Sequence, residues 1–285
     1  MSLIPRTDFH MHSNISDGTD SPEKLLELVR EEGLEIFSVT DHDTLEGSKI
    51  MRSLIKPGDP KFVNGIELSC QDEEGRYHIL GYGYDPSAPA INDAVELAHS
   101  FRESKARLRV DYVVNELGIK LPQEEIDAFL ALENPGKPQL ANILVKYGYA
   151  QSKKQAIEEI LNKFKYPSRY IRPEQAIEAL NRSGGIPVLA HPVFGSGDQT
   201  VLGDDLEKRV RRLTGFGLKG LEAFYSEFSS EHRDMVLEIA GRLDLYVTAG
   251  SDYHGRNKTV KLGRNGLDQI SSMPKGLKDF IDKVS

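Results

Sequence analysis

Short apolar runs recur along the chain, and most of them end at a glycine, a proline or a polar turn. Runs of about four to eight apolar residues bounded in this way are typical of buried β-strands. The pattern predicts strands over residues 36–40, 62–68, 78–84, 186–190, 220–224 and 245–250.

Helical periodicity alternates with these strands. Ser21, Pro22 and Glu23 form a helix start signal, and apolar residues follow on one face. Two further helices are predicted, one beginning near residue 173 and one over residues 230–242. Strands that alternate with helices predict an α/β fold with a mainly parallel sheet, and side chains at the C-terminal ends of the strands suggest a barrel-like arrangement with ligands at one rim.

A second kind of pattern interrupts this alternation and is helical throughout. It predicts a long amphipathic helix from about residue 94, followed by shorter ones over residues 124–132, 140–147 and 155–164. We interpret residues 89–165 as an inserted helical subdomain that caps the active-site rim of a core made of residues 1–88 and 166–285. The alternative, that these are further helices of the same core, stays open.

The length, net charge and cysteine content of the chain exclude several classes of function. The 285 residues suffice for one large α/β domain, or for a core with an insertion. A net charge of −8 argues against an extended duplex nucleic-acid surface, whereas a short oligonucleotide held by metal ions stays compatible with it. The single Cys70 excludes internal disulfides and fits a reducing compartment. No apolar run has the length of a signal peptide core or a membrane span, so we expect a cytoplasmic protein with no membrane partner.

Imidazole and carboxylate side chains gather at the predicted strand ends and in the turns that follow them. On a strand, residues i and i+2 share a face, so His10 and His12 point together, and the same spacing aligns Asp252 with His254. A purely structural role would bury several such groups without compensation, at several kcal/mol each. Imidazole and carboxylate bind Zn, Mn and Fe. The metal-ligand candidates are His10, His12, Asp17, His42, Glu67, His78, His191, Asp252 and His254.

The order of these motifs resembles a known family. His-x-His, Ser-Asp-Gly, Thr-Asp-His-Asp, Gly-Ile-Glu-Leu-Ser, His-Ile-Leu-Gly-Tyr, Ala-His-Pro and Gly-Ser-Asp-Tyr-His-Gly occur in the order of the PHP (polymerase and histidinol phosphatase) superfamily, and most resemble its TrpH/YciV group of metal-dependent phosphoesterases. The resemblance implies a distorted (β/α)7 barrel with an inserted small α-helical subdomain. It also implies two or three divalent metal ions (Mn, Fe or Zn) at the C-terminal rim.

The resemblance also implies how the ligands divide among the metals. The first metal would be held by His10, His12, Glu67 and Asp252. Glu67 would bridge to a second metal, which His78 and His191 also bind, and Asp17, His42 and His254 would hold a third. We expect Asp17, His191 and His254 to be the catalytic residues, and Asp41, Asp43 and His191 stay open as candidates for the group that protonates the leaving alkoxide.

Cations of the protein should complete a phosphate site. Arg102 and Arg107 lie in the first helix of the insertion, and Arg256 and Lys258 follow the Asp-Tyr-His-Gly turn, so all four are candidate substrate-binding residues. Each is, taken alone, more typical of a solvated surface charge. Tyr225 either lines the substrate pocket or serves only in packing.

The favoured function is a metal-dependent phosphoesterase that hydrolyses a phosphate ester of a small metabolite or nucleotide by a metal-activated hydroxide. A nucleotide 3′,5′-bisphosphate or a short oligonucleotide is the preferred substrate. The alternatives are a non-catalytic metal-stabilised PHP module, a phosphatase of the histidinol-phosphate type, and an amidohydrolase-like enzyme that cleaves a non-phosphate bond.

Overall fold

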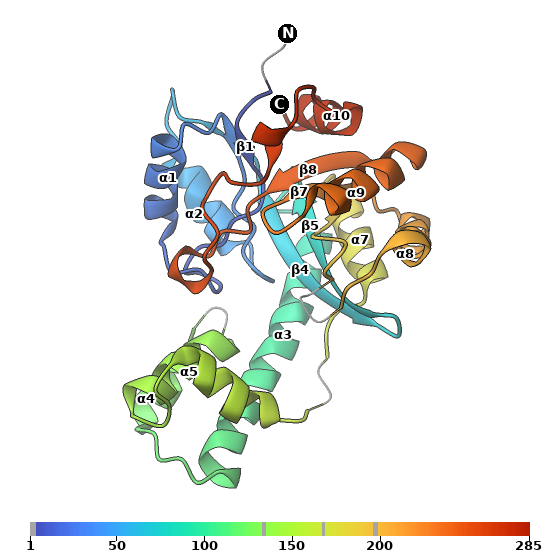
Figure 1. The fold of residues 1–285 in the computed structure, drawn as a ribbon. Coiled ribbons are helices and arrows are strands. Elements are labelled where there is room, and N and C mark those ends of the chain that lie inside the picture. Colours follow the sequence, from blue (N-terminus) through green and yellow to red (C-terminus); the bar gives the residue numbers. More distant parts are fainter. Residues whose placement is uncertain (1–3, 133–134, 167–168, 196–198) are drawn as a thin grey trace. The chain divides into compact units, whose positions relative to one another are not determined.

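The computed structural model describes residues 4–132, 135–166, 169–195 and 199–285. The chain divides into two compact units (Figure 1). The sheet unit comprises Met1–Val95 and Ile171–Ser285, and the helical unit comprises Glu96–Tyr170. In the part of the chain that the structure describes, no helix is both long enough and apolar enough to span a membrane.

Two sheets form the centre of the sheet unit. The first has the parallel strand order β1 (Thr7–Asp8), β2 (Ile36–Phe37) and β3 (Lys61–Phe62). The second has the order β4 (Gly65–Asp72), β5 (Gly75–Tyr82), β6 (Ile186–Leu189), β7 (Gly220–Tyr225) and β8 (Tyr246–Gly250). Each predicted strand region contains a strand, and the predicted strand over residues 62–68 is divided between β3 and β4.

The prediction of a mainly parallel arrangement is wrong for one part of the second sheet. β5 pairs antiparallel with β4 on one side and with β6 on the other, whereas β6, β7 and β8 are parallel. The reason lies in the turn, because Asp72 pairs directly with Gly75 and leaves only two residues between the strands. A connection this short closes a hairpin and cannot form a parallel crossover.

Backbone hydrogen bonds join the two sheets at the strand ends. On one side, the Phe9 amide donates to the Ala249 carbonyl at 2.9 Å. On the other side, the Glu67 amide donates to the Asp41 carbonyl at 3.2 Å, and the Asp43 amide donates to the Glu67 carbonyl at 2.9 Å. The structure therefore shows a mixed α/β fold in which segments that follow β1 and β2 lie against the second sheet.

Helices cover the outside of the sheets (Figure 1). They are α1 (Pro22–Glu31), α2 (Glu46–Leu54), α7 (Pro173–Arg182), α8 (Gly203–Gly215), α9 (Ser230–Arg242) and α10 (Lys275–Val284), with 3-10 turns η4 (Gly255–Asn257) and η5 (Leu267–Gln269). The predicted helices α1, α7 and α9 are confirmed, and Ser21 caps α1 by accepting a hydrogen bond from the Lys24 amide at 3.3 Å. α2, α8 and α10 were not predicted.

An aromatic cluster fixes the segment that follows β1. Phe9, Tyr82 and Phe280 are fully buried, and the Phe280 ring on α10 lies 5.0 Å from the ring of Phe9 and 5.2 Å from that of Tyr82. The Tyr82 hydroxyl donates to the Phe9 carbonyl at 3.0 Å. Because Phe9 immediately precedes His10, this packing fixes the backbone from which two predicted ligands project.

The helical unit has its own core. Its helices are α3 (Pro89–Asp111, which begins in the sheet unit), α4 (Gln123–Leu130), α5 (Lys137–Lys146) and α6 (Lys153–Gln155), with π turns η1 (Tyr112–Glu116) and η2 (Ala156–Ile160) and the 3-10 turn η3 (Leu161–Lys163). Val113, Phe129, Leu140 and Leu144 are buried together. The helices predicted over residues 124–132 and 140–147 correspond to α4 and α5. That this unit caps the rim stays a prediction.

Candidate metal centre

The two histidines after β1 lie on one side of an extended segment. β1 itself ends at Asp8, but Met11 still pairs with Tyr253, and the His12 amide donates to the Tyr253 carbonyl at 2.8 Å. Both imidazoles are fully buried, and their Nε2 atoms lie 3.1 Å apart. The predicted alternation of residues 10 and 12 is confirmed.

Asp252 and His254 also converge, but not for the predicted reason. β8 ends at Gly250, and Asp252 has a left-handed backbone with φ of 56°, so strand alternation does not align the pair. A strained turn does so at a cost of about 1–3 kcal/mol. The His254 Nδ1 atom donates to the Asp252 carbonyl at 2.9 Å, which leaves Nε2 directed towards Asp17.

Glu67 and His78 lie inside β4 and β5, which corrects the expectation that the ligands lie at strand ends or in the turns that follow them. In the β4–β5 hairpin Glu67 is opposite Leu80 and Ser69 is opposite His78, so Glu67 and His78 are diagonal neighbours on one face. Their side chains meet at 2.8 Å, between Oε1 of Glu67 and Nδ1 of His78. The hairpin thus carries two predicted ligands towards the segments that follow the parallel strands.

Five imidazoles surround the Glu67 carboxylate. Its Oε2 atom lies 3.2, 3.1 and 3.2 Å from ring nitrogens of His10, His12 and His42. Its Oε1 atom lies 2.8 Å from His78 Nδ1 and 3.3 Å from His191 Nε2. A carboxylate with both oxygens engaged in this way can bridge two cations, whereas a single imidazole nitrogen cannot.

The spacing of the first group fits a divalent cation. Asp252 Oδ1 lies 3.4 Å from His10 Nε2 and 3.3 Å from His12 Nε2. Metal–ligand bonds of about 2.0–2.2 Å in a tetrahedral site separate the ligand atoms by roughly 3.3–3.6 Å. The Nε2 atoms of His10 and His12 lie 3.1 Å apart, and a contact between two imidazole nitrogens contributes little stability by itself. A cation between them could accept the lone pairs of both nitrogens. The residues present therefore fit a bound metal.

Three groups of ligand atoms, each with all its atoms within 4.8 Å of one another, occur in the described part of the chain. They are His12, Asp17, His42 and His254; His10, His12 and Glu67; and His42, Glu67 and His78. His12 and His42 each belong to two groups, so the division among metals is less sharp than the resemblance implies.

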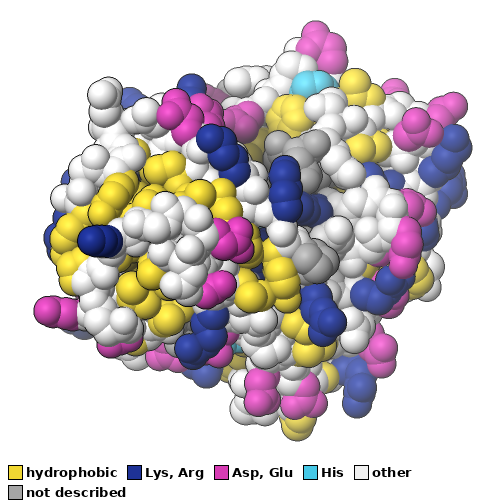
Figure 2. Space-filling view, turned by 90° about the horizontal axis from the view of Figure 1, so that it is seen from below, with side chains coloured by type: hydrophobic (Ala, Val, Ile, Leu, Met, Phe, Trp, Pro, Cys, Tyr) yellow, Lys and Arg dark blue, Asp and Glu magenta, His cyan; other side chains and the backbone are white. Residues whose placement is uncertain are grey.

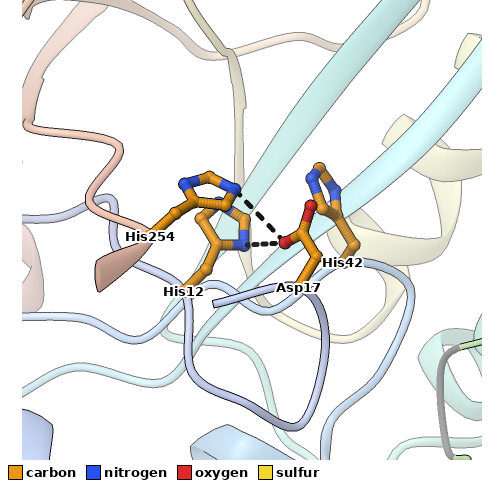
Figure 3. A group of neighbouring side chains, drawn as sticks. All are labelled: His12, Asp17, His42 and His254. Atoms are coloured by element: carbon orange, nitrogen blue, oxygen red, sulfur yellow. Dashed lines mark ion pairs between the residues drawn. The ribbon is translucent and has the colours of Figure 1, made fainter. Parts of the chain in front are cut away.

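Asp17 is at the centre of the group drawn in Figure 3. Its Oδ1 atom lies 3.2 Å from His254 Nε2 and 3.7 Å from His12 Nδ1. The Asp17 loop can approach this closely because Gly18 has no side chain, and a Cβ at Gly18 would lie 2.3 Å from the His12 carbonyl oxygen.

The electrostatics of the buried site keep Glu67 ionised and His42 neutral, whereas His12 holds a proton that a cation must displace. Burial alone would raise the pKa of Glu67, but the neighbouring His78, His42 and His10 hold it well below its usual value. Burial alone would lower the pKa of His12, yet hydrogen bonds with Asp252 and Glu67 raise it to about 9. Burial lowers the pKa of His42 to about 3.

A pocket of about 680 Å³ opens onto these side chains. It is lined by Asp17, His42, Glu67, His78, His191, Phe194, Gln199, Thr200, Tyr225, Glu227, Asp252, His254 and Lys258. The sequence analysis left open whether Tyr225 lines the pocket or serves only in packing. Tyr225 lines the pocket, and its hydroxyl donates a hydrogen bond to Asp252 Oδ2 at 3.0 Å. The ammonium of Lys258 pairs with the same carboxylate.

The other three predicted substrate-binding residues are not among those that line this pocket. Arg256 is exposed and is not among the residues that line the pocket, although its backbone amide donates to Thr19 Oγ1 at 3.0 Å. Arg102 and Arg107 are on α3 in the helical unit, and their part in binding stays a prediction.

Two of the three candidates for the proton donor have structural contacts. Asp41 accepts hydrogen bonds from the Ser13 amide at 2.8 Å and from the Ser16 hydroxyl at 2.6 Å. Asp43 accepts one from the Ser69 amide at 2.7 Å. These contacts hold the loops that carry the ligands, and they favour His191, which lines the pocket, as the remaining candidate.

Two buried acids at the site were missed by the sequence analysis. Glu222 on β7 contacts His10 Nδ1 at 3.0 Å, and Asp8 accepts a hydrogen bond from the Ser251 amide at 2.9 Å. The available signal was the position of Glu222 in an apolar strand, where an unpaired acid is costly. His99 on α3 and His232 on α9, which are not among the nine candidates, belong to none of the three groups of ligand atoms.

Comparison with known proteins agrees with the family resemblance of the sequence motifs. The family model described as the PHP domain matches residues 8–230. A 5′-3′ exoribonuclease of Haemophilus influenzae is 27% identical over 276 residues, which cover 95% of this chain and 97% of that protein. A phosphoribosyl 1,2-cyclic phosphate 1,2-diphosphodiesterase of Eggerthella lenta is 32% identical, over 87% of this chain and 94% of the relative.

A third relative is the 3′,5′-nucleoside bisphosphate phosphatase of Chromobacterium violaceum, with 26% identity over 87% of this chain and 86% of that protein. Among solved structures, a protein of Bifidobacterium adolescentis described as a metal-dependent phosphoesterase superposes with a TM-score of 0.80 at 27% identity. The superposition covers 98% of this chain and 94% of that one.

Proposed function

Because this chain belongs to the PHP domain family, and so to the metal-dependent phosphoesterases, we propose that it hydrolyses a phosphate ester of a nucleotide. The preferred substrates are a nucleoside 3′,5′-bisphosphate and the 5′ end of a short oligonucleotide. The observation that carries this proposal is the convergence of imidazoles and carboxylates around Glu67 on the wall of an open pocket.

The proposed ligand set follows the division that the family resemblance implies, and contacts in the structure support it. His10, His12, Glu67 and Asp252 would hold one metal, and Glu67 with His78 and His191 a second. Asp17, His42 and His254, with His12 close by, would hold a third. Support comes from the three groups of ligand atoms and from the contacts of His191 and Asp252 with their members. The number of metals and their identity as Mn, Fe or Zn are part of the proposal.

Charge balance favours an anionic substrate. When bound, the divalent cations would activate water and neutralise charge on the phosphoryl oxygens. Asp17, Glu67 and Asp252 carry three negative charges among them, fewer than the charge of two or three divalent cations. Lys258 adds a cation to the same pocket. Glu227 also lines the pocket and Glu222 contacts His10, so a phosphate group would meet a net positive site when three divalent cations are bound.

Three residues are proposed to act closest to the reacting phosphate. Asp17, His191 and His254 all line the pocket, and His191 Nε2 lies 3.3 Å from Glu67 Oε1. Asp17 orients His254 from one side, while the Asp252 carbonyl orients it from the other. Asp41 and Asp43 are engaged in loop hydrogen bonds, so His191 is the remaining side-chain candidate for the proton donor to the leaving oxygen, a role that it can fill only when it does not also bind the second metal.

The wall of the pocket suits a nucleotide. Phe194 and Tyr225 present aromatic rings, and Gln199 and Thr200 present amide and hydroxyl groups, beside the ligand side chains. Aromatic rings stack on bases of any sequence, and the volume of about 680 Å³ is in the usual range for small-ligand sites. The names of the exoribonuclease and bisphosphate phosphatase relatives support the same substrate class.

A second candidate substrate is a cyclic phosphodiester of ribose. It is favoured by the 32% identity to the Eggerthella lenta phosphodiesterase. This cyclic phosphodiester has no base and would use the same pocket. The assay described below distinguishes it from the nucleotide substrates.

Three finer features are proposed as well. We propose that the two sheets act together as a distorted (β/α)7 barrel and that the helical unit caps its rim. A cytoplasmic location, expected from the composition, also stays a prediction.

The direct test is a release assay with manganese-loaded protein. Adenosine 3′,5′-bisphosphate, a 5′-phosphorylated short RNA and a ribose 1,2-cyclic phosphate are offered in parallel. We expect turnover of at least one of the first two, and its loss in His12→Ala but not in the control His99→Ala, since His99 lies on α3 beside Glu103. Turnover that survives both His12→Ala and exhaustive chelation would refute the proposal.

A further inference from the structure

Glu222 is a buried acid whose contacts lead to the metal centre. It lies on β7 with a solvent exposure of 0%. Its Oε1 atom lies 3.0 Å from His10 Nδ1, and its Oε2 atom accepts a hydrogen bond from the His191 backbone amide at 2.8 Å. One carboxylate thus contacts two proposed ligands that are far apart in the sequence and follow different strands.

The backbone is shaped to place this carboxylate. The pairing of β7 with β8 shifts between Glu222 and Phe224, which marks a bulge. Bulges beside functional sites commonly redirect a side chain. An acid in the middle of a buried strand is strongly unfavourable unless its charge is compensated, and the contacts of Glu222 with His10 and with the His191 amide provide that compensation.

The neighbouring strand leaves space for the contact. A Cβ on Gly250 of β8 would lie 2.4 Å from Glu222 Oε1 and 2.2 Å from the Cβ of His10. Any side chain at this position would force Glu222 and His10 apart. The bulge and the glycine are two independent features that permit the same carboxylate–imidazole pair.

The contact determines which nitrogen of His10 faces the ligands. A carboxylate oxygen accepts, so His10 Nδ1 donates its proton to Glu222, and Nε2 is the nitrogen whose lone pair a metal can use. That nitrogen, Nε2, lies 3.2 Å from Glu67 Oε2 and 3.4 Å from Asp252 Oδ1. A carboxylate bound to the far side of a metal-binding imidazole fixes its tautomer and orientation.

The second oxygen acts on the backbone of His191. This residue has φ of 28°, an unfavourable conformation for a side chain of its size. The hydrogen bond from its amide to Glu222 helps to hold the strained turn that directs its ring towards Glu67.

We propose that Glu222 is a positioning residue that orients His10 and the turn of His191 for metal binding. This inference rests on the metal centre of the proposed function. It assigns to Glu222 no contact with the substrate.

The first test is metal binding by Glu222→Gln, measured by calorimetric titration of metal-free protein with zinc and by elemental analysis. We expect a loss of metal affinity of about 10- to 100-fold, the range found when such partners of metal ligands are removed. The matched control is Glu238→Gln, which removes an exposed acid on α9 that pairs with Arg242 at 3.4 Å. Circular dichroism checks that each metal-free variant is folded.

Metal binding by the wild-type protein and by Glu222→Gln distinguishes the role of Glu222 from the proposed function on which it rests. If wild-type protein and Glu222→Gln bind metal equally tightly, Glu222 is not a positioning residue and the proposed function stands. If wild-type protein binds no metal, the proposed function itself fails.

A second measurement uses the unaltered protein and does not depend on how the variant folds. Nitrogen-15 spectra of the histidine side chains in the zinc-loaded enzyme report the tautomer of each ring. We expect His10 to carry its proton on Nδ1 and to bind zinc through Nε2. A proton on Nε2, or zinc on Nδ1, would overturn the proposal.

Discussion

At His12, a proton and a metal ion compete for the same ring nitrogen. With no metal bound, hydrogen bonds with Asp252 and Glu67 overcome burial and raise the pKa of His12 to about 9 from an ordinary value near 6.5. Its ring nitrogens lie near Asp17 on one side and near Glu67 on the other. A cation at the site must displace that proton, so binding and pH are linked.

The linkage gives a prediction with a definite sign. Because the folded-state pKa of His12 is raised, its contribution to the stability of the metal-free protein is full below about pH 6.5 and is lost as the pH rises towards about 9. Metal affinity should change in the opposite direction and increase over the same window. Urea unfolding of metal-free protein and zinc titrations at pH 6, 7 and 8 measure the two trends. An affinity that does not vary with pH would contradict this linkage.

Lys258 is the cationic side chain among the described residues that line the pocket of the proposed phosphate site. Its ammonium pairs with Asp252, and its side chain is 37% exposed where it lines the pocket. We expect Lys258→Met to raise KM about 10- to 100-fold, the value of one charge-assisted hydrogen bond to the substrate. Metal content should be retained, because Tyr225 still donates to Asp252.

The matched control for this substitution is Lys261→Met, three residues further on and exposed. Steady-state kinetics and elemental analysis of both variants separate a substrate contact from a metal effect. Loss of metal with no change in KM would show that Lys258 supports Asp252 and does not bind phosphate.

At the scale of elements, α10 stabilises the segment that carries His10 and His12. Phe280 is fully buried against Phe9 and Tyr82, so Phe280→Ala should lower the free energy of unfolding by about 3–5 kcal/mol. Phe216→Ala, at a ring that is 38% exposed, should cost less than about 1 kcal/mol. Urea unfolding of the two variants measures the difference. Equal losses would mean that α10 does not stabilise this segment.

Elements with local signals were the ones that the sequence predicted. The start of α1 was evident from Ser21 and Pro22, since caps act within a few residues. The antiparallel direction of β5 was not, because strand alternation is the same for both directions and only the two-residue turn before Gly75 decides it.

The same distinction holds at the site. The motif residues are brought together much as their spacing suggested, yet Asp252 arrives there through a left-handed turn that no pattern indicates. Glu222 was missed because it lies in an apolar strand, and its partners His10 and His191 are recognisable only after folding. Long-range packing determines both the position of Asp252 and the contacts of Glu222, and no local sequence pattern reports such packing.

At the scale of the whole molecule, all nine proposed ligands belong to the sheet unit, and the helical unit has a separate core. On the face shown in Figure 2, Lys and Arg side chains are interspersed with Asp and Glu. On this face the distribution differs from the clustered positive charge to which a long duplex binds.

If the helical unit caps the rim as proposed, it should affect substrate binding and leave metal binding unchanged, because all nine proposed ligands belong to the sheet unit. We expect the double variant Arg102→Ala with Arg107→Ala to raise KM for a short 5′-phosphorylated RNA by roughly 10-fold, with unchanged metal content. Lys154→Ala, elsewhere in the same unit, is the control. An unchanged KM would remove these arginines from the substrate site.

The central claim is that side chains distant in the sequence form one metal-binding centre, and metal stoichiometry tests it most directly. Metal-free protein is incubated with manganese, freed of loosely bound ions by gel filtration, and examined by elemental analysis. The account predicts two or three metal ions per chain, and a clear decrease in Glu67→Gln, because Glu67 contacts five imidazoles. Less than one ion per chain in the wild-type protein with manganese, and likewise with zinc and iron, would contradict it.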